Sequence, residues 1–136
     1  MKRFTAVSLV LILLCACALI TPAYAEASRF TYINTVGATL SINESSGIAS
    51  CVASCRTHNT SDSIRIVGSL QRYNSNSNSW SQIKSWTKTG SGNITLDKSY
   101  AVYSGYRYRF VATVSIFDSN GQVIESTTPT SYYNYF

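Results

Sequence analysis

Hydrophobic and polar residues alternate along most of the chain after residue 25. This period of two is typical of a β-strand with one buried and one exposed face. Stretches rich in Gly, Pro, Asn and Ser separate the alternating segments and favour turns. The clearest segment runs from Tyr106 to Ile116, where every second residue is apolar or aromatic. The pattern predicts strands over residues 36–42, 49–56, 64–71, 80–87, 93–97, 106–116 and 122–127.

No segment between these strands has the period of an amphipathic helix, so hairpins or loops must connect them. About seven short strands at this spacing indicate an all-β fold, an antiparallel β-sandwich of the immunoglobulin or fibronectin-III-like kind. A small closed barrel is the alternative. Residues 26–136 are long enough for one hydrophobic core and too short for two, so we expect a single domain.

Two turn signals lie near the C-terminus. Asn120-Gly121 predicts a two-residue type I′ hairpin loop, because both central positions of that turn need a positive φ. Pro129 ends the last predicted strand. The aromatic residues 132–136 then form a tail that follows the predicted strands.

The first 25 residues have a different pattern, typical of a secretory signal peptide. A charged start precedes an unbroken apolar or small-residue run over residues 6–20, and Pro22 and a small-x-small site at residues 23–25 follow. We therefore expect a signal-peptide helix over residues 1–25 and a secreted domain over residues 26–136, with no transmembrane anchor in the mature form. A spanning helix would need about 20 apolar residues. Leu14 to Cys17 loosely fits a lipobox, so a lipid anchor at Cys17 is the alternative.

Charged residues are few and dispersed in the mature region. Nine of the eleven Lys and Arg residues and all six Asp and Glu residues follow residue 25, for a net charge of +3. The basic residues occur singly, whereas nucleic-acid binding needs a clustered basic stripe, so we expect no nucleic-acid partner. A charge this small is still compatible with weak attraction to an anionic cell wall or membrane surface.

Two cysteines, Cys51 and Cys55, remain after the signal peptide. On a continuous strand they lie about 13 Å apart on the same face, whereas a disulfide needs Cα atoms about 4.4–6.8 Å apart. We therefore expect two buried thiols and no disulfide. A mutual or intermolecular disulfide is the alternative. A zinc site made of both cysteines and His58 would need the two sulfur atoms to reach one ion, which the extended strand prevents, so we expect no metal.

Catalytic groups are scarce. His58 is the single histidine, and the chain has no G-x-S-x-G motif, phosphate-binding loop or dinucleotide fingerprint. We therefore expect neither a catalytic site nor a cofactor. An enzyme would require Asp62, Asp118 or Glu125 to converge with His58 in one cleft.

The aromatic residues are the main candidates for a binding site: the chain has ten Tyr, five Phe and two Trp. Trp80 and Trp86 have the same parity on their predicted strand, and Ile83 has the other. If both tryptophans face outward with Tyr73, they form a flat platform suited to sugar rings or a partner protein. The alternative is that one or both tryptophans belong to the core.

Tyr108 is the candidate for a tyrosine corner, a tyrosine near the start of the penultimate strand whose hydroxyl bonds back to the backbone. It is in phase with Phe110 and Ala112, which favours it over Tyr106.

Five stretches of the mature region carry strand and turn sequences in a shared order: Tyr32–Ile42, Ser79–Lys88, Ser91–Asn93, Leu96–Tyr100 and Ser104–Val114. Together they resemble a family of small secreted β-sandwich proteins of Gram-positive bacteria that has no assigned function. The resemblance implies secretion and a sandwich fold, and it transfers no catalytic or binding residue. The closing Ser131–Phe136 is similar to the end of a secreted β-sandwich bacteriocin family.

We expect a secreted, non-catalytic binding or cell-surface interaction module whose ligand the sequence does not identify. A cell-wall glycan or another surface protein is the expected kind of partner. The alternative is a bacteriocin-like antagonistic protein or an inhibitor, which the small size, modest basicity and aromatic C-terminus favour.

Overall fold

The computed structural model describes residues 30–135, apart from the side chain of Asn134. The expected signal peptide and the alternative lipid anchor at Cys17 lie outside the described residues. Residues 30–135 contain no α-helix, and so no helix that could cross a membrane. They form eight strands: β1 Ile33–Asn43, β2 Ile48–Thr57, β3 Ser63–Asn74, β4 Ser79–Ser91, β5 Asn93–Ala101, β6 Arg107–Phe117, β7 Val123–Thr127 and β8 Thr130–Asn134.

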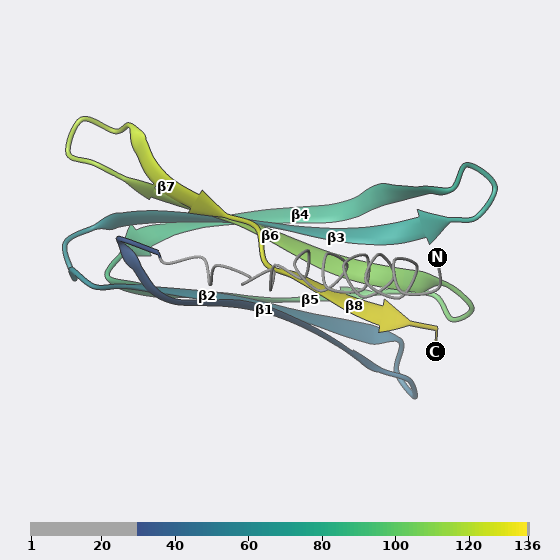
Figure 1. Ribbon diagram of the computed structural model, residues 1–136. Coiled ribbons are helices and arrows are strands. Elements are labelled where there is room, and N and C mark those ends of the chain that lie inside the picture. The colour runs from purple at the N-terminus through teal and green to yellow at the C-terminus, as the bar shows by residue number, and fades with distance from the viewer. Residues whose placement is uncertain (1–29, 136) are drawn as a thin grey trace, which may run out of the picture.

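The strands form two antiparallel sheets that pack face to face (Figure 1). One sheet has the order β1-β2-β5, and the other has the order β4-β3-β6, with β7 and β8 both paired to β6. This arrangement confirms the predicted antiparallel β-sandwich. The second and fifth strands are neighbours in one sheet and the third and sixth in the other, which is the immunoglobulin-like order.

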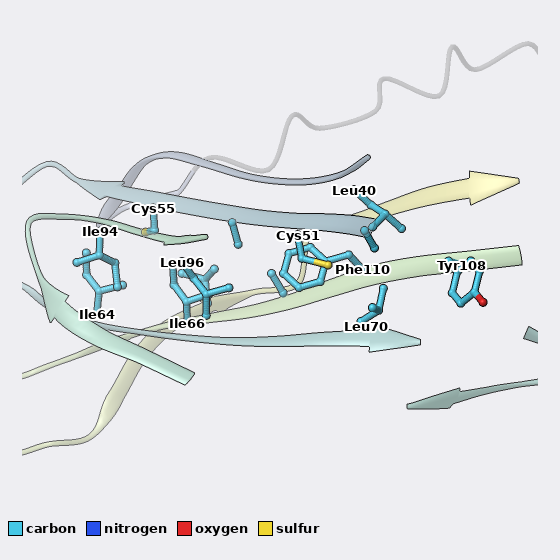
Figure 2. Close-up of a cluster of buried hydrophobic side chains, with 14 of the residues drawn as sticks. Leu40, Cys51, Cys55, Ile64, Ile66, Leu70, Ile94, Leu96, Tyr108 and Phe110 are labelled. Carbon is cyan, nitrogen blue, oxygen red and sulfur yellow. The ribbon is translucent and has the colours of Figure 1, made fainter. Parts of the chain in front are cut away.

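The core lies between the sheets and contains the alternate residues of each strand. Figure 2 shows inward side chains of the two sheets meeting, with Phe110 and Leu70 among them. Both are fully buried. Gly68 is on the same face of β3, where an added Cβ would lie 2.8 Å from the Phe110 ring. The close packing over this ring therefore explains a glycine in the middle of a long strand.

The aromatic C-terminus is a strand, which raises the total from the expected seven to eight. β8 pairs with residues 107–111 of β6, and β7 pairs with residues 114–117. Pro129 separates them, and its carbonyl oxygen accepts a hydrogen bond from the Ala112 N–H (3.0 Å). β8 also lies beside β1, where the Leu40 N–H donates to Ser131 Oγ (3.0 Å). Pro129 therefore interrupts the last strand, which then continues along β6.

The expected two-residue loop at Asn120-Gly121 is wrong. Only Gly121 has a positive φ (77°), so the loop is not a type I′ turn. The Asp118 N–H donates to the Gln122 carbonyl (2.9 Å), which leaves a three-residue loop between them. Asp118 Oδ1 accepts hydrogen bonds from the Asn120 and Gln122 N–H groups (2.9 and 2.8 Å). The Asp118 carboxylate thus stabilises the longer loop, in which glycine takes the left-handed position.

Candidate functional site

A β-bulge in β4 determines which aromatic residues face outward. Lys84 pairs with Leu70 and Gln82 pairs with Gln71, so Ile83 has no partner on β3. The extra residue reverses the alternation of β4 on either side of it. Trp86 then lies opposite Gly68 on the core face, and Trp80 lies opposite Tyr73 on the outer face. The two tryptophans therefore face opposite sides of the sheet, although they have the same parity in the sequence.

The outer face of the β4-β3-β6-β8 sheet carries three aromatic side chains and two arginines close together. We call this set the aromatic–arginine cluster: Tyr73, Trp80, Arg107, Arg109 and Tyr132. The Trp80 ring centroid lies 5.2 Å from that of Tyr73 and 6.0 Å from that of Tyr132. Tyr132 is 56% exposed, and Tyr73 and Trp80 are half-buried. The cluster is thus a continuous aromatic surface open to solvent.

The two arginines lie against the aromatic rings. The guanidinium carbon of Arg107 is 4.9 Å from the Tyr73 centroid and 5.9 Å from the Trp80 centroid. That of Arg109 is 4.5 Å from the Trp80 centroid, and its Nε donates to Gln71 Oε1 (2.7 Å). Such contacts hold the planar guanidinium groups in place by cation–π attraction. The cluster therefore combines flat apolar rings with oriented positive charge.

A pocket of about 420 Å³ opens at one edge of the cluster, between the β3–β4 and β5–β6 loops. Both loops lie at the same end of the sandwich (Figure 1). Tyr73 and Arg107 belong to both the cluster and the pocket lining. Arg72 adds a further guanidinium, 4.6 Å from the Tyr106 centroid. The pocket lining contains no Asp or Glu residue.

Trp86, the third residue of the expected platform, is not part of this surface. It is half-buried and packs against the core together with Ile83. Its ring contacts Tyr100 of the opposite sheet, with centroids 6.4 Å apart. Of the three residues expected to form a platform, the structure brings together only Tyr73 and Trp80.

Arg107 and Arg109 were missed by the sequence reasoning, whereas Tyr132 belongs to the aromatic tail that the sequence offers as part of a sugar-binding surface. The two arginines alternate with the apolar residues of β6, which was a detectable signal that they share the outer face. The position of Tyr132 beside Trp80 depends on β8 pairing with β6, which the local sequence does not indicate.

Tyr108 makes the hydrogen bonds of a tyrosine corner next to the pocket. Its hydroxyl donates to the Tyr103 carbonyl (2.8 Å) and accepts from the Tyr103 N–H (3.1 Å). Burial raises the pKa of Tyr108, against the opposing effects of the Tyr103 hydrogen bond and the Arg72 charge. The corner holds the β5–β6 loop against the start of β6 and so supports the pocket wall.

Cys51 and Cys55 are free thiols on the inner face of β2, where Figure 2 shows them among the core side chains. β2 is continuously paired through both residues. Burial raises the pKa of Cys51 to about 12. Burial, and to a lesser extent the Glu125 charge, raise that of Cys55 to about 11. Both are therefore protonated at neutral pH and are poor nucleophiles.

Two of the three carboxylates that an enzyme would need, Asp118 and Glu125, are used in structural hydrogen bonds at the opposite end. Glu125 accepts from the N–H groups of Thr31 (2.7 Å), Tyr32 (3.0 Å) and Ile33 (2.8 Å). Burial tends to raise the pKa of Glu125, but these three donors and the His58 charge outweigh it and hold the pKa below its usual value. The pocket beside His58 has no Asp or Glu in its lining.

Metal-ligand geometry does not occur in the part of the chain that the structure describes: no three His, Cys, Asp or Glu side chains gather there. No model of a known protein family matches the chain, and no curated protein matches it. The aromatic–arginine cluster and the adjoining pocket are therefore the features of the molecule that point to a function.

Proposed function

We propose that this domain acts outside the cytoplasm as a non-catalytic binding module whose ligand is a glycan. The aromatic–arginine cluster carries the proposal, because it places Tyr73, Trp80 and Tyr132 on one open sheet face. Sugar rings have flat C–H faces that pack well on aromatic side chains, and their hydroxyl groups need polar partners nearby. The adjoining pocket supplies such partners in Asn74, Asn76 and Ser81.

The sheet provides a rigid support for this surface. Tyr73 and Trp80 are directly paired residues of β3 and β4, and Tyr132 is held by pairing with Arg109 of β6. Tyr73 also donates a hydrogen bond from its hydroxyl to Asn78 Oδ1. Because the rings are fixed before the ligand arrives, binding would cost little side-chain entropy.

The test is binding of the purified mature domain to a glycan array and to insoluble cell-wall polysaccharides. We expect Trp80→Ala to lose most of the binding, since it removes the ring at the centre of the cluster. Tyr103→Ala is the matched control: this aromatic side chain is 74% exposed and lies outside the cluster. Equal binding by the wild type, Trp80→Ala and Tyr103→Ala would contradict the proposal.

The bacteriocin-like alternative depends partly on the aromatic C-terminus. In the structure that segment is β8, where Tyr133 packs against the core and its hydroxyl donates to Glu44 Oε1 (3.0 Å). The same aromatic residues therefore have a structural role. Inhibition of related bacteria by the purified domain, retained in Trp80→Ala, would favour the antagonistic function over glycan binding.

A further inference from the structure

Within residues 30–135, no carboxylate forms an ion pair with the arginines of the binding surface. The guanidinium group of Arg107 contacts the rings of Tyr73 and Trp80, and it makes no hydrogen bond to a described residue. Arg109 uses one N–H for Gln71. The carboxylates in residues 30–135 lie on other elements: Glu44 in the β1–β2 loop, Asp62 in the β2–β3 loop, Asp97 in β5, Asp118 in the β6–β7 loop and Glu125 in β7.

A guanidinium group has five N–H donors in a planar fork that matches a carboxylate or phosphate group. When its face lies over an aromatic ring, the donors at its edges remain available to a ligand. Charge-assisted hydrogen bonds to such donors are about twice as strong as neutral ones. The cluster is thus more favourable for an anionic ligand than for a neutral one.

The pocket extends this charge beyond the aromatic surface. Arg72 and Arg107 line it from adjacent strands, Asn74 lines it from the end of β3, and Asn76 lines it from the β3–β4 loop. Arg107 belongs to both the pocket and the cluster, so one ligand can cover both. A sugar ring on Trp80 would then place its acidic substituent toward Arg107 and the pocket.

We infer that the ligand is an acidic polysaccharide whose sugars carry carboxylate or phosphate groups, an inference that rests on the proposed glycan-binding function. The rings of Trp80 and Tyr132 pack on the sugar, and Arg107 with Arg72 binds the acidic group. Single-stranded nucleic acid also combines rings with negative charge, but it needs a basic groove that follows its backbone. Here the charge covers one corner of one sheet, which suits one or two acidic sugars.

The experiment compares sugars that differ only in charge. Polygalacturonate and its methyl ester share the same rings, and only the first carries carboxylates. Phosphomannan and mannan make the same comparison for phosphate. We expect the wild type to bind at least one acidic polymer about tenfold more tightly than its neutral form, with affinity falling as salt is added.

Arg107→Gln should reduce binding of the acidic polymer to the level of the neutral one. Arg65→Gln is the matched control, because Arg65 also lies over an aromatic ring, 4.5 Å from the Phe117 centroid. It is at the other end of the same sheet, so its loss should leave binding unchanged. Thermal unfolding of both variants checks that each is folded.

Several outcomes would overturn the inference. Equal binding of acidic and neutral polymers, with loss in Trp80→Ala, would reject the acidic ligand and leave the proposed function intact. An equal loss in Arg65→Gln and Arg107→Gln would indicate general charge attraction. Tighter binding of oligo(dT) than of either acidic polymer would favour nucleic acid. If no polymer binds and Trp80→Ala changes nothing, the proposed function fails as well.

Discussion

The two ends of the sandwich use their charged side chains differently. At the end with the β6–β7 loop, Asp118 and Glu125 accept backbone hydrogen bonds and so stabilise the fold. At the end with the β3–β4 loop, Arg107 and Arg109 lie on aromatic rings and have no carboxylate partner among the described residues. The Asp118 and Glu125 charges therefore serve stability, whereas the Arg107 and Arg109 charges are available for binding. Substitutions at the two ends should therefore affect different measurements.

The largest loss of stability should come from Glu125→Ala. This change removes the carboxylate that accepts hydrogen bonds from three N–H groups at and just before the start of β1. Hydrogen bonds to a charged group contribute about 1.5–3 kcal/mol, so we expect a loss of about 2–3 kcal/mol in the free energy of unfolding. Urea unfolding measures it. Glycan binding by the folded variant should stay at the wild-type level, and a binding defect would contradict the separation of the two ends.

A smaller loss is expected for Tyr108→Phe, at the binding end. It removes the two hydrogen bonds to Tyr103 and keeps the buried ring. We expect a loss of about 1–2 kcal/mol in the free energy of unfolding. Because the β5–β6 loop forms the pocket wall, binding should weaken too. Tyr103→Phe, which removes a hydroxyl from a side chain that is 74% exposed and outside the pocket lining, serves as the control. Unchanged binding in Tyr108→Phe would show that the corner does not support the pocket.

A pH dependence should follow from Glu125. Its pKa is lower in the folded protein than the ordinary value of 4.5, so its ionised form favours the folded state. This contribution is complete above the ordinary pKa and is lost as the pH falls through the folded pKa. The effect should be smaller than that of Glu125→Ala, because a protonated carboxyl still accepts one hydrogen bond. Urea midpoints at pH 7 and pH 3 should converge in Glu125→Gln relative to the wild type.

The smallest effect on stability is expected for Trp80→Ala, at less than about 1 kcal/mol, since the half-buried ring mainly contacts Arg109 and other cluster side chains. Trp86→Ala should cost more, because that ring packs on the core. The comparison pairs two tryptophans six residues apart on one strand. Chemical denaturation of both variants measures it, and a larger loss for Trp80→Ala would show that the cluster is part of the core.

Much of the fold could be predicted from local pattern. The alternation of Tyr108, Phe110 and Ala112 identified the core face of β6, and the same period located each long strand. Arg107 and Arg109 were predictable as outward residues for the same reason. The loop after Asp118 could not be predicted in this way, because a two-residue and a three-residue loop suit the same residues. Hydrogen bonds to the Asp118 carboxylate select the three-residue loop.

The candidate site was only partly predictable. Tyr73 and Trp80 were identified from their residue types, whereas for Trp86 the sequence left an outward and a core position open, and the structure has it packed against the core. The cause is the bulge at Ile83, which depends on how β4 pairs with β3. A prediction from sequence alone assumes that side chains alternate regularly along a strand. One inserted residue reverses the face on which every later side chain lies.

The sequence by itself determined the strands, the sandwich class and the residues available for the core, because side-chain period and turn preference are local properties. The tertiary structure decided that β8 pairs with β6, that β4 has a bulge, and that Tyr132 joins Trp80 and Arg109. These features depend on pairing between strands that are far apart in the chain. The register of those pairs, set by packing of the whole core, assembles the aromatic–arginine cluster.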